Sequence, residues 1–202
     1  MSPLARLARM VEESIRLKDR FFTMHGEQVL AAAEMLAQVF KAGGRVLIFG
    51  NGGSAADAQH LAAEFVNRFQ VERPPLAALA LTTDSSILTA VANDYDFRQI
   101  FAKQVRAQGR PGDLAWGIST SGNSANVVAG LDTARELGLK TLALSGGDGG
   151  PVAAASEVAL IVPSRSTPRV QEVHITIGHA LCDLVDYLLF PEKFKGGFKG
   201  GF

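Results

Sequence analysis

The first residues that could carry out chemistry lie between Phe49 and Glu64, where an apolar segment ends in the glycine-rich turn Gly50–Ser54 and a helix is expected to begin. Free backbone N–H groups and the positive end of the helix dipole make such a junction a good binding site for phosphate. Further along, His60 and Glu64 are four residues apart and therefore share one helix face. An imidazole and a carboxylate one turn apart suit a divalent metal ion or a pair of proton-transfer groups. A simple surface contact between them is the alternative interpretation.

A second polar loop, Ser119–Ser124, consists of small, amide and hydroxylated residues and precedes another predicted helix. Hydroxyl and backbone N–H groups of this kind can donate hydrogen bonds to a phosphate dianion, although Ser and Asn also simply cap helices. Neither polar loop contains lysine or arginine, and the glycines of Gly50–Gly53 do not have the dinucleotide-binding spacing. These features favour a small sugar phosphate over a nucleotide.

The composition excludes several classes of protein. The 202 residues include 20 basic and 20 acidic side chains, so the formal net charge is zero and no direct nucleic-acid partner is expected. No apolar segment approaches the roughly 18 residues that a membrane helix needs. The single cysteine, Cys182, lies in an apolar helical segment and is expected to be a buried thiol in a reducing compartment. We therefore expect a cytoplasmic domain of ordinary size.

Hydrophobic periodicity predicts two N-terminal helices, Leu4–Leu17 and Glu27–Lys41, followed by alternating strands and helices. The predicted strands are Val46–Phe49, Leu76–Leu81, Leu114–Ile118, Thr141–Leu144 and Val158–Val162. The predicted helices after the first strand are Ala55–Phe69, Ser85–Asn93, Phe97–Ala107, Asn123–Leu137, a short one around Val152–Ala155, and Val170–Phe190. Short, continuously apolar strands indicate a parallel sheet that is covered on both faces.

The predicted fold is therefore α/β: a doubly wound, flavodoxin-like, five-stranded parallel sheet flanked by helices, with its site at the carboxyl ends of the strands. We expect one domain over residues 1–191. The last residues, 192–202, repeat Phe-Lys-Gly-Gly and are expected to form a flexible tail.

Three motifs in order, Gly50–Ser54, Ser119–Ser124 and Val170–His174, resemble those of SIS-domain (sugar isomerase) phosphoheptose isomerases, and the resemblance extends to about Pro191. It implies an isomerase that converts sedoheptulose 7-phosphate to D-glycero-D-manno-heptose 7-phosphate for bacterial surface polysaccharide. It also implies a homotetramer with interfacial sites and one zinc ion per subunit.

The resemblance assigns roles to particular residues. The implied zinc ligands are His60, Glu64, Gln171 and His179. The implied substrate-binding residues are Asn51, Gly52, Gly53, Ser54, Asn93, Asp94, Ser119, Thr120, Ser121, Ser124 and Gln171. Glu64 is cast as the general base and His179 as the general acid of an enediol mechanism, in which a proton leaves carbon 1 and another returns to carbon 2. A divalent ion could polarise the carbonyl or be partly structural.

Helix geometry makes Gln171 the least certain of these ligands. Eight residues separate it from His179, which is about 12 Å along one helix and about 80° around it. The two must lean toward each other, or one must come from a neighbouring subunit; by helical phase alone, Glu172 aligns better with His179.

Pro168 stands where some family members carry an acidic residue.

Two alternative functions share the same motifs. One is a non-catalytic SIS protein that binds the DNA-replication initiator, and the other is a module that senses sugar phosphates. The presence of both Glu64 and His179 favours the enzyme, because neither alternative needs an acid–base pair.

Overall fold

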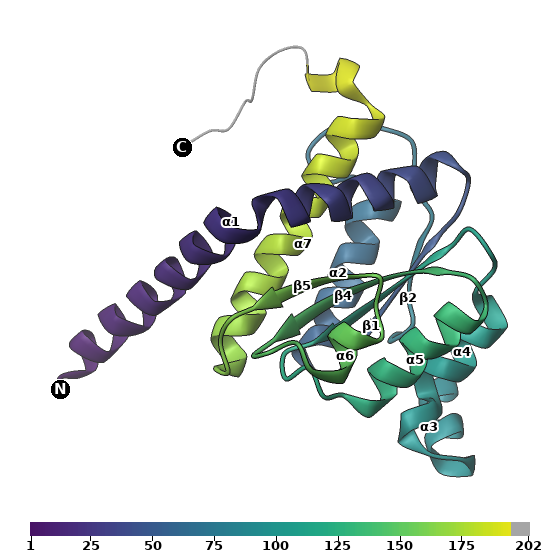
Figure 1. Ribbon diagram of the computed structural model, residues 1–202, viewed down its shortest axis with the longest axis horizontal. Helices are drawn as coiled ribbons and strands as arrows, with labels where there is room; N and C mark the ends of the chain where they lie inside the picture. The colour runs from purple at the N-terminus through teal and green to yellow at the C-terminus, as the bar shows by residue number, and fades with distance from the viewer. Residues whose placement is uncertain (195–202) are drawn as a thin grey trace.

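The computed structural model describes residues 1–194 and contains one five-stranded, all-parallel sheet between two layers of helices (Figure 1). The strands are β1 (Val46–Gly50), β2 (Ala78–Ala80), β3 (Leu114–Ser119), β4 (Lys140–Gly146) and β5 (Val158–Val162). The helices are α1 (Pro3–Lys41), α2 (Gly53–Val66), α3 (Ser85–Asp94), η1 (Phe97–Gln99), α4 (Ile100–Gln108), α5 (Ala125–Glu136), α6 (Gly150–Ala154), α7 (Thr167–Leu189) and η2 (Pro191–Phe194).

The strands are apolar throughout because both faces of the sheet are covered. Along β1, Val46 and Ile48 belong to the core beneath α1, α2 and α7, whereas Leu47 and Phe49 belong to the core beneath α4, α5 and α6. Trp116 on β3 is fully buried in the first of these cores. This alternation confirms the prediction of a doubly wound parallel sheet and explains why its strands lack the polar face of an antiparallel sheet.

The strand order is β2-β1-β3-β4-β5. The connection after β1 therefore leads to β2 on one side of the sheet, whereas the connection after β3 leads to β4 on the other side. The neighbours β1 and β3 are in register from Val46 opposite Leu114 to Gly50 opposite Ile118. The loops that follow them therefore leave the same edge of the sheet side by side. In a fold of this order, that switch point is where ligands bind.

The prediction of two N-terminal helices is wrong, because α1 runs without a break from Pro3 to Lys41. The predicted break lies between Leu17 and Glu27, and the one glycine of that segment, Gly26, costs a helix only about 1 kcal/mol. The buried stripe that begins at Phe21 and continues through Val29 and Leu36 offsets that cost. The N-terminal half of α1 instead projects beyond the body of the molecule (Figure 1).

The other predicted elements are present with small shifts of their ends. The predicted strand Leu76–Leu81 is shorter in the structure, and the predicted helix Phe97–Ala107 begins as the 3-10 turn η1. The predicted tail begins within η2, whose Phe194 ring packs against Tyr187; residues 195–202 lie outside the described part of the chain. No helix among residues 1–194 is long and apolar enough to cross a membrane.

Two titratable side chains of α7 are fully buried in the core. The Nε2 atom of His174 lies 3.1 Å from the Ser145 carbonyl oxygen at the end of β4 and donates to it in the neutral tautomer protonated at that nitrogen. Burial lowers the pKa of His174 to about 4, although the Ser145 hydrogen bond opposes the shift. Burial also raises the pKa of the Cys182 thiol well above its usual range, and nearby carboxylates add to that effect.

The buried imidazole predicts a pH-dependent stability. An unfolded chain binds a proton at His174 below about pH 6.5, whereas the folded chain does so only below about pH 4. The free energy of unfolding should therefore decrease by up to roughly 3 kcal/mol as the pH falls through that window. Urea unfolding between pH 7 and pH 4 should show a larger decrease in the wild type than in His174→Gln, which keeps a donor that does not titrate. His25→Gln, at a partly exposed position, is the control; equal pH slopes in all three proteins would contradict the assignment.

Candidate functional site

The two polar loops at the switch point are joined by a pair of amides. Asn51 Nδ2 donates to Asn126 Oδ1, and Asn126 Nδ2 donates back to Asn51 Oδ1, both at 2.8 Å. Asn126, which none of the sequence motifs indicated, is buried in the first turn of α5. A buried amide at the start of an apolar helix was the available signal, because such a group needs a partner.

The second polar loop, Ser119–Ser124 after β3, is called the hydroxyl loop below, and its hydrogen bonds centre on Ser119. Its Oγ lies 2.8 Å from Ser124 Oγ and 3.4 Å from Ser121 Oγ, while the Asn123 backbone N–H donates to Ser121 Oγ. Three predicted hydroxyl groups are thus gathered at the N-terminus of α5, where Ser124 is the N-cap residue and its side chain makes no capping bond. Hydroxyl groups that donate only to one another can redirect their protons toward a bound phosphate.

The turn between β1 and α2 holds the other predicted loop residues. Gly52 precedes α2 with a positive φ of 54°, Gly53 begins the helix, and the Ser54 backbone N–H donates to the Asn51 carbonyl. Ser54 itself is buried. These residues therefore lie beside the hydroxyl loop, as the parallel pairing of β1 with β3 requires.

Three of the four predicted metal ligands meet where α2 and α7 lie side by side. The Nε2 atoms of His60 and His179 are 2.8 Å apart, and Glu64 Oε1 is 3.5 Å from His60 Nε2. The helices approach this closely because residue 178 is glycine: a Cβ there would stand 2.6 Å from Leu61 Cδ2. As the side chains stand, no group of three His, Cys, Asp or Glu residues among residues 1–194 is arranged to hold a metal ion.

The His179 imidazole has a distinctive environment. The Phe69 ring stacks against it with centroids 5.5 Å apart. Partial burial and the neighbouring His60 lower the pKa of His179, while the Glu64 carboxylate acts in the opposite direction. A neutral imidazole beside a carboxylate is a suitable arrangement for moving protons near neutral pH.

Gln171 lies apart from this cluster, nearer the glycine turn. Its amide packs on Gly53, where any Cβ would clash with it, and its Nε2 donates to the Asp57 carboxylate oxygens at 3.4 and 3.5 Å. No hydrogen bond among the described residues joins it to His60 or His179. The sequence analysis missed Asp57, although it precedes His60 by three residues and therefore lies on the same helix face.

Asn93 and Asp94 are at the exposed C-terminal end of α3 and bond to each other at 2.8 Å. Within the described chain, no hydrogen bond connects them to the two polar loops. The predicted residues of the two polar loops thus lie together, and so do His60, Glu64 and His179. Asn93 and Asp94 belong to neither group.

A buried arginine that the sequence analysis did not single out fixes α2 against α7. Arg73 donates to Asp186 of α7 at 2.8 Å and to the Glu64 and Phe65 carbonyl oxygens at the end of α2 at 2.9 and 2.6 Å. Its guanidinium therefore satisfies carbonyl groups that a helix end leaves without partners. It also sets the position of Glu64 relative to α7.

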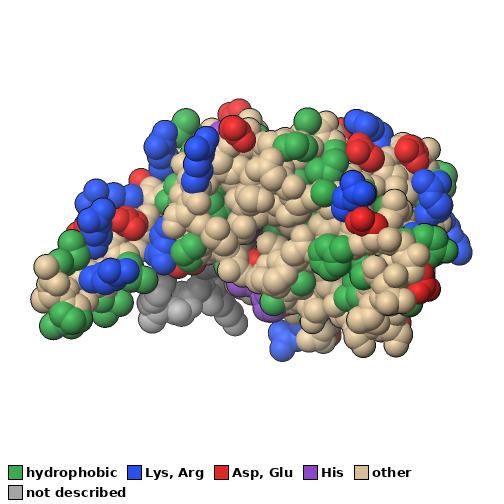
Figure 2. Space-filling view, turned by 90° about the horizontal axis from the view of Figure 1, so that it is seen from below, with side chains coloured by type: hydrophobic (Ala, Val, Ile, Leu, Met, Phe, Trp, Pro, Cys, Tyr) green, Lys and Arg blue, Asp and Glu red, His purple; other side chains and the backbone are tan. Residues whose placement is uncertain are grey.

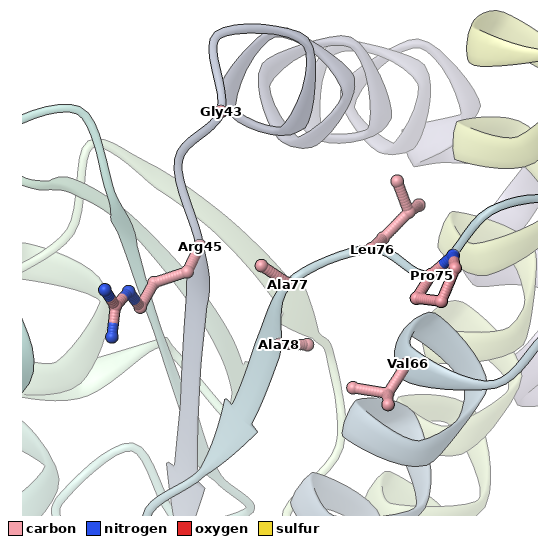
Figure 3. A pocket seen from close by; sticks show the side chains of 7 residues that line it. All are labelled: Gly43, Arg45, Val66, Pro75, Leu76, Ala77 and Ala78. Atoms are coloured by element: carbon pink, nitrogen blue, oxygen red, sulfur yellow. The ribbon is translucent and has the colours of Figure 1, made fainter.

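A hollow of about 410 Å³ lies at the amino ends of the strands, between the end of α1, the end of α2 and the start of β2 (Figure 3). Its lining is mostly apolar, and Arg45 points away from it, toward Asp113. Because the strands begin at this edge, it lacks the loops that build sites in parallel sheets. We do not place the catalytic site there.

Comparisons with known proteins agree with this geometry. The profile of the SIS domain family matches residues 10–146, so the chain contains a SIS domain, the class of sugar isomerase folds. It is 58% identical to a phosphoheptose isomerase of Solidesulfovibrio magneticus over 96% of this chain and 95% of that protein. It is 57% identical to one of Nitratidesulfovibrio vulgaris over 89% and 86%, respectively. The structure of phosphoheptose isomerase from Neisseria gonorrhoeae superposes with a TM-score of 0.87 at 48% identity, covering 92% of this chain and 99% of that one.

The chain belongs to the phosphoheptose isomerase family and is an isomerase of sugar phosphates.

The Asp57–Gln171 pair predicts separable effects on activity and stability. Asp57→Asn removes the anionic acceptor that orients the Gln171 amide, so isomerase kcat/KM should fall about 10- to 100-fold. The melting temperature should not fall, because burial raises the pKa of Asp57 and the substitution removes a poorly solvated charge. Asp132→Asn, on the exposed side of α5, is the matched control. Unchanged kcat/KM in Asp57→Asn would show that the pair has no role in positioning.

Proposed function

We propose that this protein converts sedoheptulose 7-phosphate to D-glycero-D-manno-heptose 7-phosphate through an enediol. The observation that carries this proposal is that His60, Glu64 and His179 meet on the two helices that border the glycine-rich turn Gly50–Ser54. The names of the most similar relatives support the class of substrate. Heptose synthesis for a surface polysaccharide in the cytoplasm is the corresponding physiological role.

The spacing along α2 suits a long sugar phosphate. His60 follows Gly53 by seven residues, about 10 Å along the helix. A substrate whose phosphate is held at the hydroxyl loop must span such a distance to bring its carbonyl to the cluster. A seven-carbon chain phosphorylated at carbon 7 has its reacting carbons 1 and 2 at the far end, as this arrangement requires.

The proposed proton transfers use Glu64 and His179. Glu64 removes a proton from carbon 1 of the ketose, and His179 donates a proton to the oxygen at carbon 2, giving the enediol. Return of a proton to carbon 2, with loss of the proton from the oxygen at carbon 1, gives the aldose. Partial burial, together with the neighbouring His60, lowers the pKa of His179 and so helps to keep this imidazole from carrying a permanent charge.

The donor atoms are those that zinc prefers. Donors around a tetrahedral zinc ion lie roughly 3.3 Å apart. Here two imidazole nitrogens are 2.8 Å apart and a carboxylate oxygen lies 3.5 Å from one of them, so the two rings must separate for these side chains to take up an ion, which their present positions do not do. We therefore propose that His60, Glu64 and His179 hold one zinc ion per subunit, with Gln171 as fourth ligand if its amide turns from Asp57. When bound, the ion would polarise the substrate carbonyl and stabilise negative charge on the enediolate. Because a zinc-bound carboxylate or imidazole is a poor proton carrier, the ion would either move aside during turnover or have a partly structural role.

The catalytic proposal predicts the behaviour of Glu64→Gln. This variant should lose about 10²- to 10⁴-fold in kcat because it cannot accept the carbon 1 proton. The measurement is NMR of sedoheptulose 7-phosphate in heavy water, with and without added zinc, in which the wild type should place deuterium at carbon 2 of a heptose product. Glu72→Gln, on the exposed side of the same region, is the control.

Two outcomes would contradict the proposal in different ways. Full activity in Glu64→Gln would remove this residue from the role of base. Absence of exchange by folded wild type under every metal condition would favour the non-catalytic alternatives, and binding to the replication initiator or to sugar phosphates alone would then be tested.

We also propose that the protein is a homotetramer with interfacial sites. Leu4, Leu7, Val11 and Ile15 form one stripe along the projecting half of α1 and are 78%, 56%, 51% and 61% exposed. Figure 2 shows hydrophobic side chains beside basic ones at the projecting end of the molecule. An apolar stripe with this spacing is typical of a helix that packs against another helix.

The stripe predicts the effect of a charge at its centre. Leu7→Glu should dissociate the assembly at micromolar concentration in sedimentation velocity, because a buried unpaired carboxylate is costly. Arg16→Glu introduces the same residue on the opposite face of α1 and should leave the assembly intact. If both variants sediment like the wild type, the stripe does not form the interface.

A further inference from the structure

A second hollow, of about 280 Å³, lies at the carboxyl ends of β3, β4 and β5. Three loops line it. Thr120, Ser121 and Asn123 come from the hydroxyl loop, Asp148 from the loop after β4, Arg165 from the loop that leads into α7, and Thr167 from the first turn of that helix. The hollow thus shares its wall with the hydroxyl loop, but its charged residues lie in loops that the motifs do not include.

Backbone hydrogen bonds hold the three loops together. The Val152 N–H donates to the Gly122 carbonyl at 3.0 Å, and the Gly147 N–H donates to the Ser164 carbonyl at 2.9 Å. Within the middle loop, Ser145 Oγ donates to the Gly149 carbonyl at 2.8 Å. The walls are therefore fixed relative to one another, so a ligand would meet a largely pre-formed surface.

Arg165 is the one basic residue in the lining, and its guanidinium is available. It is exposed and forms no hydrogen bond or ion pair with another residue among positions 1–194, whereas neighbouring Arg169 is paired with Glu172 at 2.9 Å. Asp148, the other charged residue in the lining, is also exposed and has no ion-pair partner within the described chain. The hollow therefore presents one cation and one anion beside a row of hydroxyl groups.

We propose that Arg165 binds the substrate's phosphate group from the open side of the hydroxyl loop, and that Asp148 limits the strength of this anion binding. The inference rests on the proposed function for the identity of the substrate. The hydroxyls and N–H groups of the two loops donate hydrogen bonds but carry no formal charge. A guanidinium supplies that charge and can donate two parallel hydrogen bonds to one phosphate, whereas a carboxylate at the rim repels a dianion.

Opposite effects of two substitutions test the proposal. Inorganic phosphate is titrated into each protein by calorimetry, and KM and kcat are measured with the sugar phosphate. Arg165→Gln should raise the phosphate Kd and the KM about 10- to 100-fold, while kcat changes little, because one charge-assisted contact is lost. Asp148→Asn should lower both Kd and KM, and Arg165→Lys should restore part of the binding. The differences should shrink at high salt.

Arg135→Gln, which removes an exposed arginine from α5, is the matched control. If Arg165→Gln binds phosphate as that control does, the inference is wrong even when the isomerase reaction is confirmed. If phosphate binding depends on Arg165 but no heptose phosphate is turned over, the inference stands and the proposed function fails.

Discussion

The arrangement of the site depends on one buried cation between α2 and α7. Arg73 joins the last carbonyl groups of α2 to Asp186, so the end of α2 is held at a fixed position along α7. Loss of either charged partner would leave an uncompensated charge in the core, which proteins tolerate poorly. Gly178 then sets how closely the helices approach, and the histidines meet as a result. The catalytic cluster is therefore a product of helix packing at two points that lie outside it.

The sheet provides the second half of the arrangement. Because β1 and β3 are parallel neighbours whose connections diverge, two polar loops emerge together, and the Asn51–Asn126 amide pair keeps them in contact. The α2 helix begins in one of these loops and carries His60 and Glu64 away from it. One rigid element thus links the phosphate-binding region to the acid–base cluster, which allows the position of one end of a substrate to determine that of the other.

The local patterns of the sequence predicted most of the fold. Strands such as Val46–Phe49 are short and apolar on both faces, and the motif loops follow them directly. The predicted gap between the helices Leu4–Leu17 and Glu27–Lys41 does not exist in the structure, because contacts with distant elements outweigh a weak local preference. The functional site likewise has some contacts that local spacing predicted and others that it did not. His60 and Glu64 share a helix turn and could be paired from spacing, whereas the Asp57–Gln171 and Arg73–Asp186 pairs join residues more than a hundred positions apart. Those depend on how α7 packs, which no local pattern encodes.

The burial of Cys182 has a practical consequence for studies of motion in this protein. Its thiol is inaccessible and its elevated pKa leaves almost no thiolate at neutral pH, so thiol reagents will not modify it in the folded state. A reporter cysteine can therefore be introduced at any exposed position without first replacing the native one. Spin labels or fluorophores attached in this way would follow the helices and loops in an otherwise unaltered background.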